Sequence, residues 1–393
     1  MSDQRRNFGT RALWAAVQHD SPARDVVAPI HHSVNFAYDD IDEWFDVARG
    51  AKPGYIYSRN RNPTVRALEL TMRDLDDAEE AVSFSTGMAA ISNTLFTLLV
   101  PGDRVVAIKD AYGGTNKLFL EFLPRSQIDV SLCDTLDADA IETEIRKGCK
   151  VLYLETPTNP VLKIVDIARL AGAAHEQGAI VIVDNTFATP INQRPLELGA
   201  DLVVYSATKY LNGHSDAMGG ILCGPRELVS AVHHYREING AALHAGPAYM
   251  ILRGLKTLEL RIQRHNESAG TIAAFLHRHH KVETVFYPGL PDHPNHAIAK
   301  RQMDGFGGML SFALKGGFDE VRKMLSLLRY AHNAASLGSV STLVGPPMAT
   351  SHVELTAGER ETMGIPESLI RYSTGIENVE DLVADLDHAL SQL

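Results

Sequence analysis

The chain has 393 residues, of which 45% are hydrophobic and 7% aromatic, so it is long enough to bury two or three layered substructures. Its 37 Lys and Arg residues against 48 Asp and Glu give a formal net charge of -11, which excludes a basic field for nucleic acid. Three scattered cysteines, a polar start and no apolar stretch of roughly twenty residues predict a soluble, cytoplasmic protein without a membrane partner.

The first 55 residues differ in pattern from the rest of the chain. Three prolines (Pro22, Pro29 and Pro53) and a polar cluster at His31–Ser33 predict an extended arm. Arms of this kind often cross onto a neighbouring subunit. We therefore expect residues 1–55 to contact one.

Short apolar runs alternate with amphipathic stretches in residues 56–245. Helical spacing begins at Ile167 and stops before Gly178. Runs rich in Val and Ile are typical of parallel strands buried on both faces, and four are present: Arg104–Ile108, Lys150–Leu154, Ala179–Val183 and Asp201–Tyr205. This βαβ order predicts a three-layer α/β domain with a mostly parallel sheet.

A long helical pattern over residues 246–277 predicts a helix that links this large domain to a smaller one. Beyond it, Gly308–Leu314 has the pattern of a strand, and Val379–Leu390 that of a closing amphipathic helix. We therefore expect a large domain over 56–245 and a C-terminal domain over 246–393.

Polar residues follow the predicted strands, where ligands bind in an open α/β sheet. Asp184 follows one strand and Ser206 the next, so we expect both at one edge, on strands that could be neighbours. A carboxylate there could pair with a pyridinium nitrogen or cap a helix, and position alone favours the cap. Lys209 could be a surface charge, but small and apolar neighbours favour a buried, neutral amine that can form an imine.

Two more segments suit the same ligand. The Ser85–Ala90 segment resembles a loop that begins a helix. The N–H groups of its first turn could bind a phosphate, or they could simply donate to an N-cap side chain. Ser206 and Thr208 add two hydroxyl groups beside the lysine. Tyr112 precedes two glycines and could stack on a planar cofactor, although alone it is more often a turn aromatic.

Arg371 lies between Ile370 and Tyr372 in a strand-like run, so its side chain faces the side opposite theirs. A planar guanidinium suits a carboxylate, and a surface ion pair is the ordinary alternative. The 17 histidines could suggest a metal enzyme instead. Adjacent pairs such as His31–His32 diverge, however, and make poor chelates, so we expect no metal.

Together, the ordered motifs resemble the Cys/Met-metabolism family of pyridoxal-phosphate (PLP) enzymes, the transsulfuration group of fold type I. The resemblance extends over nearly the whole chain and lies in these segments: Tyr57–Thr64, Ser85–Ala90, Ala111–Thr115, Glu155–Pro160, Val183–Phe187, Ser206–His214 and Ile370–Glu377. It implies the PLP-dependent transferase fold, with a three-layer αβα large domain and a smaller C-terminal α/β domain. The implied chemistry is γ-elimination or γ-replacement on a sulfur-containing or homoserine-derived amino acid.

The resemblance also implies roles for single residues. Lys209 would form the Schiff base with PLP and carry protons, Asp184 would bind the pyridine nitrogen, and Tyr112 would stack on the ring and serve as an acid or base. The phosphate would be held by Gly87, Met88, Ser206 and Thr208, joined from a neighbouring subunit by Tyr57 and Arg59. The substrate carboxylate would be bound by Asn159, Ser336 and Arg371. Such shared sites imply a homotetramer built as a dimer of dimers.

Some positions differ from particular family members. Ser341 stands where several members carry Glu, and Ile56 stands where cystathionine γ-lyases tend to have an acidic residue. Both positions therefore lack a negative charge that could bind the distal amino group of cystathionine. Gly114 stands where many methionine γ-lyases have Cys, and Pro346–His352 is unusual in the expected substrate region. The sequence leaves open elimination or replacement, an O-acylhomoserine sulfhydrylase, and a β-lyase acting on cysteine or cystathionine. A silent PLP-binding homologue is the other alternative, but Lys209 is present.

Overall fold

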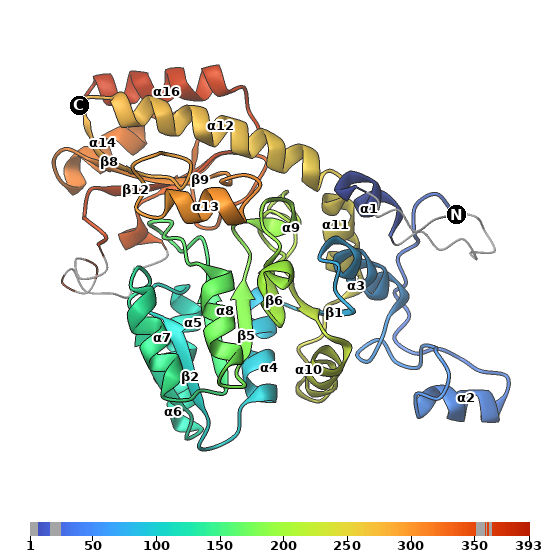
Figure 1. Ribbon diagram of the computed structural model, residues 1–393. Coiled ribbons are helices and arrows are strands. Elements are labelled where there is room, and N and C mark those ends of the chain that lie inside the picture. The colour runs from blue at the N-terminus through green and yellow to red at the C-terminus, as the bar shows by residue number, and fades with distance from the viewer. Residues whose placement is uncertain (1–6, 16–24, 351–357, 359, 361–363) are drawn as a thin grey trace.

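The structure is a computed structural model that describes residues 7–15, 25–350, 358, 360 and 364–393. It contains two layered units, the larger one below and the C-terminal one above in Figure 1. Some sequence features fall outside the described residues: the polar start of the chain, Pro22 in the arm, and Ser351 and His352 in the unusual segment.

The larger unit is built on a mostly parallel sheet, as the sequence predicted. Within the described residues it has seven strands in the order β1-β7-β6-β5-β4-β2-β3, with only β7 antiparallel to its neighbours. Their bounds are β1 (Glu80–Phe84), β2 (Arg104–Ile108), β3 (Asp129–Cys133), β4 (Val151–Glu155), β5 (Ile180–Asp184), β6 (Leu202–Ser206) and β7 (Gly220–Gly224). The four predicted strands are present. β2 has the predicted bounds, and β4, β5 and β6 lie one residue later.

Helices pack against this sheet because its central strands are apolar on both faces. α7 and α8 pack side by side in front of the sheet in Figure 1, and α4 packs across β6 and β7. The helices of this unit are α3 (Pro63–Leu75), α4 (Gly87–Leu98), α5 (Gly113–Lys117), α6 (Leu123–Arg125), α7 (Ala138–Arg146), α8 (Ile167–His175), α9 (Thr189–Asn192) and α10 (Arg226–Asn239). A π-helical turn, Leu118–Phe122, joins α5 to α6. This αβα arrangement confirms the predicted fold class.

The C-terminal unit has its own sheet and its own hydrophobic core. Its five described strands follow the order β10-β11-β12-β9-β8, and all neighbours except β10 and β11 are antiparallel. The elements are β8 (Val282–Phe286), α13 (His296–Gln302), β9 (Met309–Leu314), α14 (Phe318–Leu327), β10 (His332–Asn333), β11 (Leu343–Gly345), β12 (Leu369–Ser373) and α16 (Val379–Ser391). The predicted strand at Gly308 and the predicted closing helix are thus present, each shifted or extended by one residue.

The prediction of a single long helix over residues 246–277 is wrong, because the segment forms two helices, α11 (Ala245–Leu255) and α12 (Leu258–Arg278). Gly254 lies so close to the backbone of Asn212 that a Cβ would come within 2.1 Å of the Asn212 carbonyl oxygen. The Gly254 carbonyl also accepts a bond from Arg261 Nη2 at 2.7 Å. The contact with the distant Asn212 backbone and the bond from Arg261 on α12 fix the chain where one helix gives way to the next.

α12 joins the two units, since Ile262 belongs to the core of the large unit and Ala269 to the core of the C-terminal unit. Figure 1 shows α12 crossing the upper part of the molecule, below α16, toward α1. The domain boundary near residue 246 stays a prediction.

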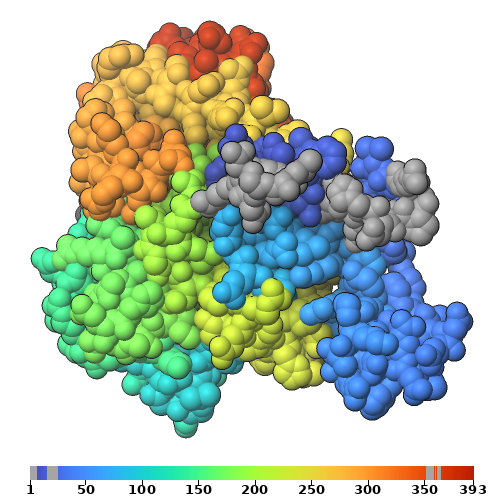
Figure 2. Space-filling view, turned by 45° about the vertical axis from the view of Figure 1, so that its right-hand side comes forward, coloured from blue at the N-terminus to red at the C-terminus, as the bar shows by residue number. Residues whose placement is uncertain are grey.

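The N-terminal arm is less extended than the sequence predicted, because it contains α1 (Phe8–Trp14) and α2 (Ile41–Ala48). No residue of α2 is buried, and Ile41 and Phe45 are 68% and 62% exposed. Figure 2 shows this blue segment as a lobe beside the rest of the chain. Its contact with another subunit stays a prediction. Among the described helices, none combines the length and apolar character needed to span a membrane.

Candidate active site

The candidate site lies where β4, β5 and β6 end. β5 and β6 are neighbours, so Asp184 and Ser206 lie at the same edge of the sheet, as expected. A cavity of about 300 Å³ opens there, within the range of small-molecule sites. The predicted residues that line it are Gly87, Met88, Tyr112, Asn159, Asp184, Ser206, Thr208, Lys209, Ser336 and Arg371.

Lys209 places its amine inside this cavity. The turn after β6 carries it there, and its Nζ donates a hydrogen bond to Ser336 Oγ at 2.7 Å. Burial, and then the positive charge of Arg371, lower the pKa of Lys209 to about 8. A substantial fraction of the amine is therefore neutral near physiological pH. The surface-charge alternative does not fit this buried position.

Asp184 is the last residue of β5 and is only 8% exposed. Its Oδ1 accepts a bond from the Thr186 backbone N–H at 3.0 Å, and its Oδ2 lies 3.5 Å from the Tyr153 hydroxyl. Burial raises the pKa of Asp184 above its usual range. A cationic partner in the cavity would offset that cost and favour the carboxylate form.

The start of α4 supplies an anion-binding surface. The Thr86 side chain caps the helix by accepting a bond from the Ala89 N–H at 3.0 Å, so the cap alternative holds for Thr86. Helix geometry gives the N–H groups of Gly87 and Met88 no acceptor within the helix, and they lie at the cavity. At Gly87 a Cβ would lie 2.7 Å from Ser206 Cβ, so glycine allows the helix to approach β6.

Arg371 reaches the same cavity from the other unit. It lies on β12 and is 6% exposed, while Ile370 and Tyr372 face the C-terminal core. Its guanidinium donates to Asn159 Oδ1 at 3.1 Å and to the Ser336 carbonyl at 2.8 Å. Burial lowers the pKa of Arg371 to about 10, so the group stays charged at neutral pH. Arg371 is thus a buried cation rather than part of a surface ion pair.

Glu155 also lines the cavity, and the sequence argument gave it no role. It ends β4 beside Asp184, and its Oε2 accepts the Tyr112 backbone N–H at 2.8 Å. Its position after a buried apolar run was a signal that could have identified it.

Tyr57 and Arg59 do not line this cavity. They lie at a different hollow of about 400 Å³, beside His31, His32 and His244. The Arg59 guanidinium lies 5.3 Å from the centre of the Tyr57 ring. Neither residue is therefore among the described residues that line the Lys209 cavity of its own chain.

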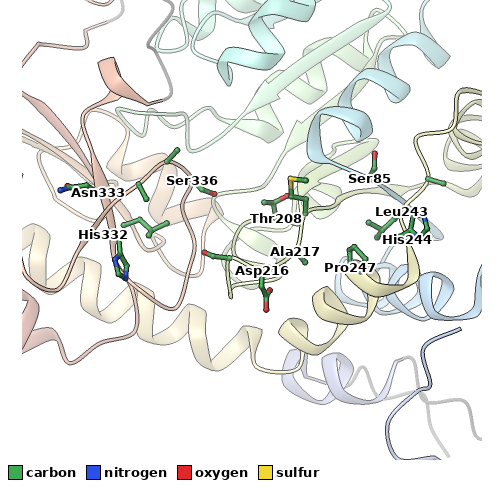
Figure 3. A pocket seen from close by; sticks show the side chains of 16 residues that line it. Ser85, Thr208, Asp216, Ala217, Leu243, His244, Pro247, His332, Asn333 and Ser336 are labelled. Atoms are coloured by element: carbon green, nitrogen blue, oxygen red, sulfur yellow. The ribbon is translucent and has the colours of Figure 1, made fainter. Parts of the chain in front are cut away.

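A larger cavity of about 1010 Å³ adjoins the Lys209 site and shares Thr208, Met218 and Ser336 with it. Figure 3 shows His332 and Asn333 on one side of this space and Leu243, His244 and Pro247 on the other. We treat it as the approach to the site.

Two of the sequence differences lie at or near the site. A Cβ at Gly114 would come within 2.9 Å of both Met88 Sδ and Tyr112 Cε1, so a larger residue would displace one of them. Thr350, from the unusual segment, lines the cavity. Ile56 and Ser341 are not among the described residues that line it.

The cavity fits PLP, which has an aldehyde, a pyridine nitrogen and a phosphate. An amine of lowered pKa, a buried carboxylate that lacks a cationic partner among the protein contacts described above, and the first residues of helix α4 are present in one space. With a mostly parallel αβα sheet, these groups define a PLP-dependent enzyme of fold type I.

Comparison with known proteins identifies the family. Residues 9–391 match the family described as Cys/Met metabolism PLP-dependent enzyme, and the chain belongs to it. The resemblance inferred from the motifs is confirmed, and PLP is the cofactor.

Relatives in this family have several activities. The chain is 42% identical to an L-methionine gamma-lyase of Fusobacterium nucleatum subsp. polymorphum, with 100% of both chains covered. It is 41% identical to a cystathionine beta-lyase of Coxiella burnetii, with 99% of each covered. The crystal structure of cystathionine gamma synthase from Xanthomonas oryzae pv. oryzae, in complex with aminoacrylate and cysteine, superposes with a TM-score of 0.94 at 38% identity and 99% coverage of both chains.

Proposed function

We propose that this PLP enzyme catalyses γ-elimination or γ-replacement on a sulfur-containing or homoserine-derived amino acid. The γ-chemistry is supported by the 42% identity to an L-methionine gamma-lyase. The observation that supports an amino-acid substrate is the position of Ser336, which contacts Lys209 through Oγ and Arg371 through its carbonyl oxygen. A substrate carboxylate bound by Arg371 would therefore leave the rest of an α-amino acid within reach of the Lys209 amine.

The protein groups would divide the work as follows. PLP, when bound, supplies an electron sink that stabilises negative charge at the substrate Cα. Lys209 would take the Cα proton and return it, since its amine lies in the same cavity as the groups that would bind the substrate carboxylate. Asp184 would bind the ring nitrogen and keep it protonated. The start of α4, with Ser206 and Thr208, would hold the phosphate.

γ-Chemistry needs a second proton transfer, at Cβ, before the group on Cγ leaves. Lys209 and Tyr112 are the acid or base candidates for this step, and both line the cavity. Tyr112 is 46% exposed and so could also protonate the departing group at the open side. Water then releases a 2-oxo acid and ammonia, whereas an incoming thiol gives replacement.

A substrate panel tests this proposal. Methionine, homocysteine, cystathionine and an O-acylhomoserine are each supplied with and without cysteine, and ammonia, 2-oxobutanoate and new thioethers are measured. We expect 2-oxobutanoate or a thioether from at least one of them, and neither product from Lys209→Ala. Turnover confined to β-substituted substrates such as cysteine would refute the γ assignment.

A β-lyase is the second candidate, favoured by the 41% identity to the Coxiella burnetii cystathionine beta-lyase. Cystathionine separates the two chemistries, because β-cleavage yields pyruvate and γ-cleavage yields 2-oxobutanoate. Measurement of pyruvate beside 2-oxobutanoate in the same assay therefore decides between them.

We infer that the enzyme works as a homotetramer, a dimer of dimers with shared sites. Tyr57 and Arg59 do not line the Lys209 cavity of their own chain and would serve the phosphate of a neighbour. The exposed apolar residues of α2 support the same inference, since contact with another subunit would bury them. We also infer a cytoplasmic location, which suits three free cysteines.

A further inference from the structure

We propose that Glu155 is a positioning residue of the site, which holds the Tyr112 loop. Glu155 stays protonated, so that Asp184 is the ionised carboxylate beside the cofactor ring. The inference rests on the proposed function and deepens it by adding a residue to the same site. It follows from strand register, from one hydrogen bond and from burial.

Strand register brings the two carboxyl groups together. Glu155 ends β4 and pairs in register with Asp184, which ends the neighbouring parallel strand β5. Side chains at paired positions of parallel strands point to the same face of a sheet. Both residues are buried, at 5% and 8% exposure, and both line the cavity.

Two carboxylates in one buried space do not both ionise readily, so one keeps a proton. Burial, and then Asp184, raise the pKa of Glu155 well above its usual range, although backbone N–H bonds from Tyr112 and Asn159 oppose that rise. Burial also raises the pKa of Asp184, but bonds from Thr186 and Tyr153 oppose that rise. A cationic ring nitrogen would favour an ionised Asp184 further. Glu155 is therefore the group that keeps the proton.

The hydrogen bond to Tyr112 gives Glu155 its positioning role. Glu155 Oε2 accepts the Tyr112 backbone N–H at 2.8 Å. Other contacts hold the residues before Tyr112: Asn116 donates to the Lys109 and Ala111 carbonyls, and Lys163 pairs with Asp110. The Glu155 bond acts on Tyr112 itself, at the point where α5 begins. Without it, the ring would lose the contact that ties its own backbone to the sheet edge.

The test compares Glu155→Ala and Glu155→Gln in the PLP-loaded enzyme. The readouts are the visible circular dichroism of bound PLP, the PLP dissociation constant and the pH profile of the visible band, none of which depends on turnover. Because the alanine variant lacks the acceptor, we expect reduced dichroism and about tenfold weaker PLP binding. Glutamine keeps the acceptor and resembles a neutral acid, so dichroism should be largely restored and the pH profile unshifted.

Asp385→Ala is a matched control, because Asp385 is a buried carboxylate that also accepts backbone N–H groups, those of Arg329 and Tyr330. It lies on α16 in the C-terminal unit, so its loss should leave the dichroism of PLP unchanged. If Glu155→Ala does not fold, Glu155→Asp takes its place, since the shorter side chain keeps the acid but draws it back from Tyr112.

Several results would overturn the inference. Wild-type dichroism and PLP affinity in Glu155→Ala, or in Glu155→Asp if that replaces it, would show that other contacts hold the loop. A pH profile shifted in Glu155→Gln would show that Glu155 carries charge. The wild-type enzyme is measured in the same series, so a missing visible band or missing turnover there would count against the proposed function instead.

Discussion

The amine of Lys209 differs from an ordinary lysine because the turn after β6 buries it beside Arg371. Both effects favour the neutral form, and the pKa falls to about 8. Only the neutral amine can attack an aldehyde, so the shifted pKa links this residue's position to its chemistry.

This shift predicts how PLP attachment to the cofactor-free enzyme depends on pH. Below the Lys209 pKa the amine is protonated, so the attachment rate should rise about tenfold per pH unit and level off above pH 8. Stopped-flow absorbance of the visible band measures it. A small lysine derivative, run in parallel, corrects for the pH dependence of PLP itself. A rate that still climbs toward the ordinary lysine pKa of about 10.4 would contradict the buried-amine account.

At the scale of elements, the junction of α4 and β6 depends on the glycine at the helix start. A Cβ at Gly87 would lie 2.7 Å from Ser206 Cβ and 3.0 Å from Ser206 Cα. The backbone cannot yield there as a flexible side chain could. An added methyl group must push the helix start away from the strand end that would hold the phosphate.

Gly87→Ala should therefore fold but bind PLP at least about tenfold more weakly, measured by cofactor titration, because the helix N–H groups move. Gly172→Ala is the matched control: Gly172 lies within α8, where nothing comes within 4 Å of an added Cβ. Alanine there should raise stability by about 0.5–1 kcal/mol without changing PLP affinity. Equal PLP affinity in the two variants would count against α4 as the phosphate site.

Much of this arrangement could be predicted from the sequence, for a physical reason. Strands buried on both faces appear as continuous apolar runs, so β2, β4, β5 and β6 and the polar residues after them were recognisable. The break between α11 and α12 was not, because it arises from contact between Gly254 and the distant Asn212 backbone. Glu155 was recognisable as a polar residue after such a run, but its role was not, because that role depends on strand order, which places β4 beside β5.

At the scale of the whole molecule, the site requires both units. Lys209 follows β6 of the large sheet, whereas Arg371 lies on β12 of the C-terminal sheet, and Ser336 contacts both side chains. α12 contributes residues to the cores of both units and so connects them. Because Tyr57 and Arg59 lie at another hollow, completion of the site is expected to need a second chain.

Mixing two inactive variants tests whether sites are shared. Arg59→Ala supplies an intact Lys209, and Lys209→Ala supplies an intact Arg59, so each hybrid dimer would contain one complete site. After subunit exchange at equal amounts, activity should return to about a quarter of the wild-type value, because half of the dimers are hybrid and each has one working site. Activity no higher than the sum of the separate variants, with exchange verified, would exclude sharing.

The most direct test of the whole account is the site of covalent attachment. The PLP-loaded enzyme is reduced with borohydride, digested and mapped by mass spectrometry, with Lys163, which pairs with Asp110, as an internal comparison. We predict one phosphopyridoxyl group per chain, on Lys209, and none in Lys209→Ala. A label on another lysine, or no label at all, would contradict the assignment of Lys209 as the residue that binds PLP covalently.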